Sequence, residues 1–213
     1  MEKNTFQEKN WQGKFGEDYI NRNSFKLKEM DNLYRNNYGI TRTELNKEFL
    51  KKINASVKIL EVGSNIGIQL LFLQKMGFSS LYGIEINKTA IEFSRKNLKN
   101  INIIEGSALD IPFKDNYFDL VFTSGVLIHI SPNDIGNVMK EIYRVTKKYI
   151  WGFEYYADEY TEIPYRGKRS ILWKANFPEM YLKNFKDLKL VKEKKLKYLD
   201  NENIDTMFLL KKK

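Results

Sequence analysis

The chain has 213 residues, 42% of them hydrophobic and 14% aromatic, which is enough material for one domain with a full core. It has no cysteine and a single histidine, so a disulfide framework is excluded and we expect no protein-built metal site. The net charge of +9 comes from lysines scattered among acidic residues, which favours a solvated surface over a nucleic-acid footprint.

Residues 1–10 are polar and lack the apolar centre of a signal peptide. No apolar run approaches the about 20 residues that are needed to cross a bilayer. The sequence therefore predicts a cytoplasmic protein without a membrane span. We expect its ligands to be small molecules rather than nucleic acid, and the sequence leaves the oligomeric state open.

Residues 1–52 predict helices. Leu27, Met30, Leu33 and Tyr34 recur at helical spacing. An aromatic stretch, WQGKFGEDYINRN, precedes them. This stretch could form a lid over a ligand or simply a helix packed on the core, and the sequence does not choose between the two.

Beyond this segment, strand patterns alternate with helical patterns. The strand patterns cover residues 57–62, 80–86, 101–106, 117–125 and 147–156. The helical patterns cover residues 67–76, 88–98 and 131–145, the last with Ser131 as the expected N-cap and Pro132 in the first turn. Such alternation predicts βαβ units and a parallel sheet, with residues 53–156 as the ligand-binding core.

The last part of the chain breaks this rhythm. Residues 157–183 hold two of the four prolines with several aromatic and basic residues, and we expect a loop-rich insertion there. Residues 188–199 and 205–212 then predict a final, antiparallel strand pair. We expect a single domain over residues 1–213, in which 157–213 contribute the substrate insertion and the last strands.

The stretch ILEVGSNIG, at residues 59–67, is where we expect a ligand, because a doubly wound sheet binds ligands at the carboxyl ends of its strands. A dinucleotide loop reads G-x-G-x-x-G and cradles a pyrophosphate on backbone amides. Here the loop runs from Gly63 to Gly67, with Asn65 where close approach to a pyrophosphate needs glycine. Glu61 would repel a pyrophosphate and attract a cationic ligand.

S-adenosylmethionine fits these features, because it has no phosphate and its amino group and sulfonium are both positive. Glu85 ends the next strand pattern, about twenty residues further on, where an acidic side chain can accept the ribose hydroxyls. NAD enzymes share that last feature. Glu61, Glu85 and the short glycine loop together favour S-adenosylmethionine over a dinucleotide.

Four segments, in order, resemble the motifs of the class I S-adenosylmethionine-dependent methyltransferases. They are ILEVGSNIG, GIEIN, GSALDIPF and FDLVFTSGVLIHI, and the resemblance covers about residues 57–156. It implies a Rossmann-like α/β fold, with a mostly parallel seven-stranded sheet, helices on both faces and, here, a helical N-terminal extension. It also implies S-adenosylmethionine as methyl donor and S-adenosylhomocysteine as product.

Two positions depart from the family pattern. Asn65 stands where the family often has glycine, and Ser107 where it often has aspartate to accept the adenine amino group. A serine hydroxyl can also form hydrogen bonds, and the backbone amide of Ala108 could donate one to the adenine ring. The cofactor contacts that we expect are Tyr19, Arg22, Glu61, Gly63, Ser64, Asn65, Gly67, Glu85, Ile86, Ser107, Ala108, Leu109, Ser124 and Gly125.

Two further stretches, WQGKFGEDYINRN and EYYADEYTEIPYRGKRSILWKANF, are similar to a smaller group, the methyltransferases associated with pseudaminic acid biosynthesis. That likeness implies a sugar or nucleotide-sugar acceptor, methylated on oxygen or nitrogen. The substrate contacts that we expect are Tyr155, Tyr156, Arg166, Lys168 and Arg169. The basic ones would clamp an anionic group, although a solvated charge run explains them equally well.

His129 and Glu154 are the candidate bases that would take a proton from the acceptor. His129 follows the fourth strand pattern, where a packed histidine bonded to backbone is an equally good interpretation. Glu154 ends the fifth strand pattern, at the ligand edge of the predicted sheet. Three other functions stay open: methyl transfer to RNA or protein, cofactor binding without catalysis, and nucleotide-sugar oxidoreduction or epimerisation, which Asn65 disfavours.

Overall fold

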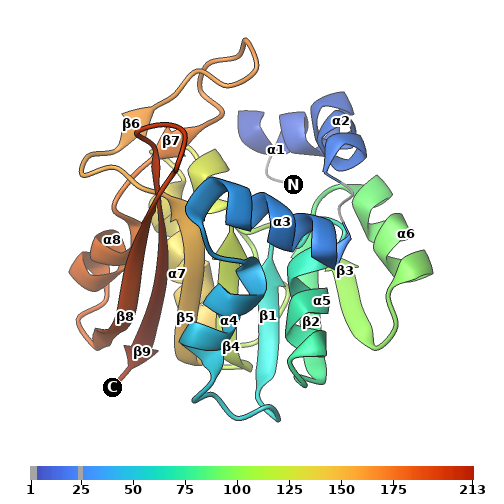
Figure 1. Ribbon diagram of the computed structural model, residues 1–213, viewed down its shortest axis with the longest axis vertical. Helices are drawn as coiled ribbons and strands as arrows, with labels where there is room; N and C mark the ends of the chain where they lie inside the picture. The colour runs from blue at the N-terminus through green and yellow to red at the C-terminus, as the bar shows by residue number, and fades with distance from the viewer. Residues whose placement is uncertain (1–3, 24–25) are drawn as a thin grey trace.

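A seven-stranded mixed sheet runs through the centre of the computed structural model, which describes residues 4–23 and 26–213 (Figure 1). Its strands lie in the order β3-β2-β1-β4-β5-β9-β8. They are β1 (Lys58–Val62), β2 (Ser80–Glu85), β3 (Ile101–Glu105), β4 (Phe118–Ser124), β5 (Thr146–Tyr155), β8 (Leu188–Lys197) and β9 (Ile204–Lys212). The first five are parallel, whereas β9 pairs antiparallel with both β5 and β8. The predicted α/β fold and the antiparallel final pair are confirmed.

Helices cover both faces of this sheet. They are α1 (Phe6–Gln12), α2 (Lys14–Arg22), α3 (Leu27–Tyr38), α4 (Arg42–Leu50), α5 (Ile68–Lys75), α6 (Lys88–Asn97), α7 (Ile135–Val145) and α8 (Phe177–Asn184), with a short 3₁₀ turn, η1, at Leu127–His129. Apolar side chains of α3, α4 and α5 pack on one face, and those of α7 and α8 on the other. The predicted helical N-terminal extension is confirmed.

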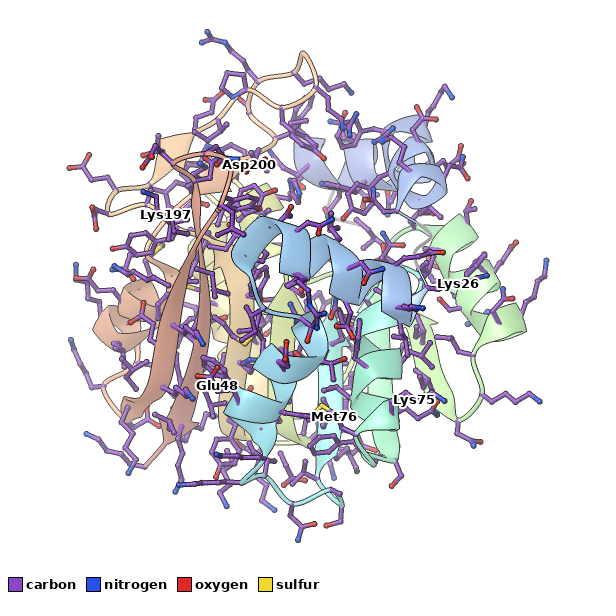
Figure 2. All side chains as sticks on the ribbon, viewed as in Figure 1. Lys26, Glu48, Lys75, Met76, Lys197 and Asp200 are labelled. Atoms are coloured by element: carbon purple, nitrogen blue, oxygen red, sulfur yellow. The ribbon has the colours of Figure 1, made fainter. Side chains whose placement is uncertain are left out.

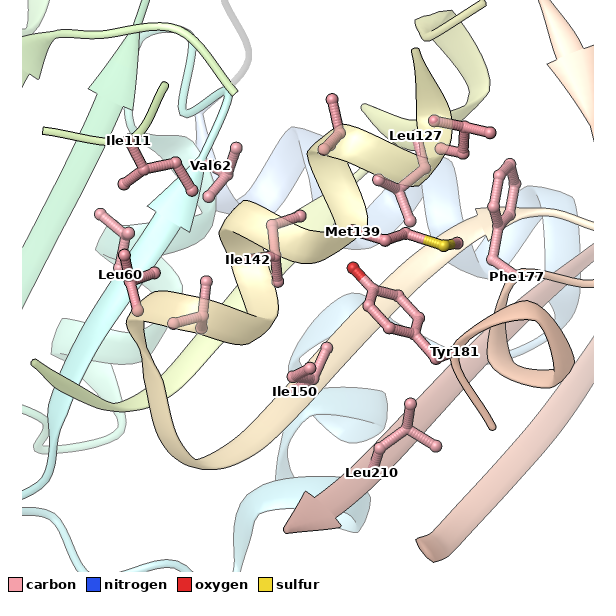
Figure 3. Close-up of a cluster of buried hydrophobic side chains, with 14 of the residues drawn as sticks. Leu60, Val62, Ile111, Leu127, Met139, Ile142, Ile150, Phe177, Tyr181 and Leu210 are labelled. Carbon is pink, nitrogen blue, oxygen red and sulfur yellow. The ribbon is translucent and has the colours of Figure 1, made fainter. Parts of the chain in front are cut away.

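Helix α7 shows how sequence periodicity builds one of these two cores. Its buried residues recur with the spacing of a single helical face, and they are Ile135, Val138, Met139, Ile142 and Val145. Figure 3 shows Met139 and Ile142 directed toward Ile150 of β5 and Tyr181 of α8. Burial of this apolar stripe holds the helix against the strands whose carboxyl ends form the predicted ligand-binding edge of the sheet.

Two sequence predictions need correction. Ser131 does not cap α7: its carbonyl accepts from the amides of Asp134 and Ile135, which forms a turn, and the helix begins only at Ile135. The region predicted as a loop-rich insertion contains the helix α8, whose N-cap Asn176 accepts a hydrogen bond from the Glu179 amide. In both places local hydrogen bonding of a short polar side chain or turn decided the helix start.

The strand order reverses between β1 and β4, and this reversal creates a crevice at the carboxyl edge of the sheet. Helices α1 and α2 lie at this edge, as does the segment that carries the two short strands β6 (Thr161–Glu162) and β7 (Trp173–Lys174), at the top of Figure 1. The Gln7 side chain of α1 donates to the Ser170 carbonyl at 2.9 Å. Segments from the two ends of the chain therefore meet over the ligand edge.

Charged side chains are spread over the surface. Figure 2 shows Lys26, Lys75 and Lys197 at three separate places on the molecule. Several lysines are paired with acids, such as Lys192 with Glu48 at 2.8 Å. Within residues 4–23 and 26–213, no helix is both long enough and apolar enough to cross a membrane.

Gly152 of β5 leads to a stability prediction. A Cβ atom at this position would lie 2.2 Å from Cζ of Phe208, its partner on β9. We expect Gly152→Ala to lower the free energy of unfolding by about 1–3 kcal/mol, because the ring is packed in the core and cannot yield freely. Urea denaturation measures this loss.

The matched control is Gly136→Ala in α7, where an added Cβ meets nothing within 4 Å. Because alanine favours the helix, this variant should be unchanged or stabilised by up to about 1 kcal/mol. Equal effects of the two substitutions would contradict the close packing of β5 on β9.

Candidate active site

A cavity opens at the carboxyl edge of the sheet, where β1, β2, β3 and β4 end. The loops after these four strands form its floor, and α1 and α2 close it from the other side. Of the side chains and backbone positions predicted from sequence, those that line it are Tyr19, Gly63, Asn65, Glu85, Ile86, Ser107, Ala108, Leu109, Ser124, Gly125 and His129. Segments far apart in the sequence thus converge on one site.

The loop after β1 has the left-handed backbone that glycine favours. Gly63 has φ of 69° and Gly67 has φ of 79°, and Asn65 lies between them at 47°. A Cβ atom on Gly63 would lie 2.7 Å from Cγ2 of Val126, so this glycine is also required by the close approach of the loop after β4. Asparagine tolerates the left-handed region, which explains why Asn65 fits where the family pattern has glycine.

Glu85 holds the first two loops together. Its carboxylate accepts hydrogen bonds from the Asn65 amide at 2.7 Å and from the Ile86 and Asn87 amides at 2.8 Å. Burial raises the pKa of this carboxyl, and the three amides act in the opposite direction. Because Glu85 lines the cavity, an acidic acceptor is presented to a ligand in a fixed orientation.

Glu61 lies behind the loop and does not line the cavity within the described part of the chain. It is only 2% exposed, and its Oε2 atom has no hydrogen-bond partner among the described residues. Burial raises the pKa of Glu61 well above its usual range, and the nearby guanidinium of Arg42 partly offsets this effect. An unpaired, buried carboxylate oxygen is costly unless a ligand or water completes it.

Arg42, in α4, lies behind the cavity lining and contacts it through Ser124, and the sequence analysis missed this residue. It is fully buried and contacts the rings of Trp151 and Phe153, 5.4 Å and 4.9 Å from the guanidinium carbon. Its Nη1 atom donates to the hydroxyl of Ser124, which lines the cavity, at 3.3 Å. Its Nη2 atom has no partner among the described residues.

A signal for Arg42 was present in the sequence. It shares one helical face with Leu45 and Phe49, at positions i, i+3 and i+7, and both of these are buried. A cation on an apolar stripe is buried only with a compensating partner.

The loop after β3 carries Ser107, and this residue meets the N-terminal helix. The Ser107 hydroxyl donates to Glu8 Oε1 of α1 at 2.5 Å and accepts from the Leu109 amide at 3.0 Å. Glu8 also lines the cavity. The sequence analysis missed Glu8, whose pattern with Thr5 marks only a capping box, which the structure also contains.

Tyr19 and Arg22 were both predicted to contact the cofactor from α2. Tyr19 lines the cavity, with its ring 5.3 Å from that of Trp11, and burial raises its pKa. Arg22 is exposed in the last turn of α2 and is outside the cavity lining. Ser64 and Gly67 of the glycine loop are likewise behind the lining, within the described residues.

His129 lies in η1 and lines the cavity. Its Nδ1 atom is 2.7 Å from the Ile171 carbonyl, which can only accept, so Nδ1 carries the proton and Nε2 has the free lone pair. The ring of Trp11 is 4.5 Å away, and burial lowers the pKa of His129 to about 4. His129 is thus bonded to the backbone and also lines the cavity. Its role as a base stays a prediction.

Glu154 is fully buried and does not line the cavity within residues 4–23 and 26–213. Its carboxylate accepts from the Val126 amide at 3.2 Å and from the Ile128 amide at 3.4 Å. Burial raises the pKa of Glu154 to about 7, against the effect of these donors. The side chain therefore holds the segment that carries His129, and this geometry suits a positioning role.

The predicted substrate contacts lie outside the cavity lining, in the insertion or directly before it. Tyr155 and Tyr156 are partly exposed, and Tyr156 donates to Asp158. Arg166, Lys168 and Arg169 are exposed. These basic side chains lie on the segment beside α1, since Lys168 donates to Asn10 at 2.7 Å.

Comparison with known proteins agrees with this geometry. Residues 60–149 match the family model of the methyltransferase domain. Demethylmenaquinone methyltransferase of Geobacillus sp. (strain WCH70) is 38% identical over 72 residues, which cover 32% of this chain and 30% of that protein. Phosphoethanolamine N-methyltransferase of Plasmodium falciparum (isolate 3D7) is 24% identical over 167 residues, which cover 68% of this chain and 63% of that protein. The chain thus spans less than two thirds of the length of these curated relatives.

Solved structures share the fold at low identity. A putative S-adenosylmethionine dependent methyltransferase from Listeria monocytogenes has a TM-score of 0.62 at 13% identity, over 81% of this chain and 100% of that one. The chain has the class I methyltransferase fold. A Burkholderia thailandensis 1,6-didemethyltoxoflavin-N1-methyltransferase with bound S-adenosylhomocysteine has a TM-score of 0.62 at 12% identity, over 80% and 76% of the chains.

The cofactor of such methyltransferase domains is S-adenosylmethionine, with S-adenosylhomocysteine as product. The residues present fit it. Arg42 and Glu61 each have one buried polar atom, Nη2 and Oε2, without a partner among the described residues. Both side chains lie behind the cavity lining, Arg42 bonded to Ser124 and Glu61 two residues before Gly63. The methionyl part of the cofactor carries a carboxylate and an ammonium, which are the complementary charges.

The single histidine makes the titration of this site directly observable. With a folded pKa of about 4 and an unfolded value near 6.5, protonation opposes folding, and stability is lost as the pH falls from about 6.5 toward 4. We expect the His129 ring resonance to stay constant from pH 8 to about 5 in NMR spectra. As the pH falls from about 6.5 to about 4, the free energy of unfolding should decrease by on the order of 3 kcal/mol relative to the His129→Gln variant. A ring midpoint near pH 6.5 would contradict the buried, neutral imidazole.

Proposed function

We propose that the protein transfers a methyl group from S-adenosylmethionine to an oxygen or nitrogen atom of a small acceptor. The observation that carries this proposal is that two buried polar atoms, Arg42 Nη2 and Glu61 Oε2, lack a partner among the described residues, next to the cavity that Glu85 lines. A pyrophosphate would meet carboxylates at both strand ends, whereas a zwitterionic amino acid and a ribose would find complementary groups.

The binding roles follow from the contacts of each side chain. Arg42 would hold the methionyl carboxylate and Glu61 the ammonium group, because each has one unpaired polar atom. Glu85 would accept the ribose hydroxyls, since three amides already orient its carboxylate. The residues Ala108 and Leu109 would lie along the adenine ring.

When bound, S-adenosylmethionine supplies a methyl group attached to a positively charged sulfur. The chain's own residues then have to align the acceptor and exclude water. Trp11 and Tyr19 line the cavity from the side of α1 and α2, where they separate it from solvent. Such enclosure keeps water from competing with the acceptor.

His129 is the group best placed to handle the acceptor's proton. Its Nε2 lone pair can accept a hydrogen bond from an acceptor N–H or O–H, while the Ile171 carbonyl fixes the tautomer. A pKa of about 4 makes it a weak base, so it would take the proton only as the new bond to the methyl group forms. Glu154 would act through the segment that it holds, as a positioning residue.

A sugar or nucleotide-sugar is the acceptor class that we favour, which extends the proposal beyond a small acceptor in general. The two stretches similar to the methyltransferases associated with pseudaminic acid biosynthesis pack together beside the cavity, with the centroids of the Phe15 and Tyr165 rings 6.1 Å apart. Lys168, Arg166 and Arg169 lie on the same segment and would meet an anionic group on such an acceptor.

Calorimetric titration of the purified chain with S-adenosylmethionine, S-adenosylhomocysteine and NADH tests the function. We expect micromolar binding of the first two and none of NADH, because the site lacks a pyrophosphate cradle. Radiolabelled methyl transfer to a panel of sugars and nucleotide-sugars then identifies the acceptor. Binding of NADH alone would overturn the proposal, and labelling of RNA or protein in preference to small molecules would redirect it to a macromolecular acceptor.

Arg42→Lys tests the methionyl site. Lysine keeps the charge but loses the planar fork, so we expect the affinity for S-adenosylhomocysteine to fall about tenfold or more. Binding of 5′-methylthioadenosine, which lacks the carboxylate and ammonium groups, should stay unchanged. Arg35→Lys, an exposed position on α3, is the control and should change neither affinity. An equal loss for both ligands would show that Arg42 acts only on the fold.

A further inference from the structure

One hydrogen bond joins the N-terminal helix to the floor of the cavity. Ser107 donates to Glu8 Oε1 at 2.5 Å, across 99 residues of sequence, and both side chains line the cavity. Ser107 stands at the position where the class I methyltransferase pattern often has aspartate to accept the adenine amino group. The carboxylate missing from the strand end is therefore present in the same place, supplied by α1.

Glu8 is held in position from two sides. Its Oε2 atom accepts from the Thr5 amide at 2.9 Å, and its Oε1 atom accepts from Ser107. Helix α1 is itself anchored, because the neighbouring Gln7 side chain donates to the Ser170 carbonyl at 2.9 Å. Each carboxylate oxygen keeps a further lone pair, so Glu8 can still accept from a ligand without losing these bonds.

The sheet register indicates which part of the ligand meets Glu8. Glu85 and Glu105 are paired at the ends of the adjacent strands β2 and β3, and Ser107 comes two residues after Glu105. A nucleoside whose ribose is held by Glu85 would extend its base over the end of β3, toward Ser107 and Glu8. At that end a carboxylate is a stronger acceptor for an N–H donor than a serine hydroxyl.

We propose that Glu8 accepts a hydrogen bond from the exocyclic amino group of the cofactor's adenine, so that helix α1 is part of the cofactor site and selects a 6-aminopurine. This inference rests on the proposed function. The N-terminal helix then does more than exclude water: cofactor binding and the docking of α1 stabilise each other, since they share one carboxylate.

The test compares S-adenosylhomocysteine with S-inosylhomocysteine, in which the 6-amino donor is replaced by a carbonyl acceptor. Calorimetry on the full chain should give at least about tenfold tighter binding of the amino compound, because the 6-carbonyl would face a carboxylate without a hydrogen. In Glu8→Gln this ratio should fall about tenfold, since the amide can donate to the carbonyl. Glu17→Gln, at an exposed position on α2, is the matched control and should keep the wild-type ratio.

Two more variants separate recognition from folding of the helix. Ser107→Ala removes the hydroxyl that holds Glu8, and we expect the ratio to fall in the same direction by a smaller factor. Ser107→Asp combined with Glu8→Gln supplies a carboxylate from the strand end and should restore the ratio. A ratio that stays low in this double variant would contradict an adenine amino group between positions 8 and 107.

The outcomes distinguish this inference from the proposed function. If the wild-type chain binds neither homocysteine compound, the proposed function itself fails. If it binds S-adenosylhomocysteine and Glu8→Gln leaves the ratio unchanged, only the role of Glu8 is overturned.

Discussion

Three backbone amides converge on the carboxylate of Glu85, and the arrangement of the site depends on that convergence. One amide comes from the loop after β1 and two from the loop after β2, so a single side chain sets the separation of these loops. The remaining walls, after β3 and β4, follow from the parallel register of the strands. Burial raises the pKa of the Glu85 carboxyl, and the three amide donors act in the opposite direction by favouring its charged form.

The outer wall of the cavity comes from parts of the chain that are distant in sequence. Helix α1 contacts the insertion through Gln7 and Ser170, and Trp11 lies against His129, with ring centroids 4.5 Å apart. The insertion in turn fixes the imidazole through the Ile171 carbonyl. The N-terminal helices and the insertion thus both contact His129. The packing of these two segments is therefore coupled to the protonation state of this imidazole.

Buried charge is the unusual energetic feature of this molecule. Arg42 and Glu61 are both removed from water, and each leaves one polar atom unpaired among the described residues. The rings around Arg42 and its bonds to Asn46 and Tyr34 offset part of the desolvation cost. A zwitterionic ligand would complete both groups, so the same atoms that destabilise the free protein would contribute to the affinity for the proposed cofactor.

The sequence by itself determined the alternating strands and helices, the antiparallel final pair and the loop residues at the strand ends, because these depend on local periodicity and turn chemistry. Asn65, Glu85 and Ser107 were found in this way. Arg42 and Glu8 were decided only by the tertiary structure, since Arg42 comes from α4, which packs on one face of the sheet, and Glu8 from α1, which lies at its carboxyl edge. The place of Glu154 was also a tertiary result: it is near the end of β5 but outside the cavity lining, because its buried carboxylate accepts from the Val126 and Ile128 amides.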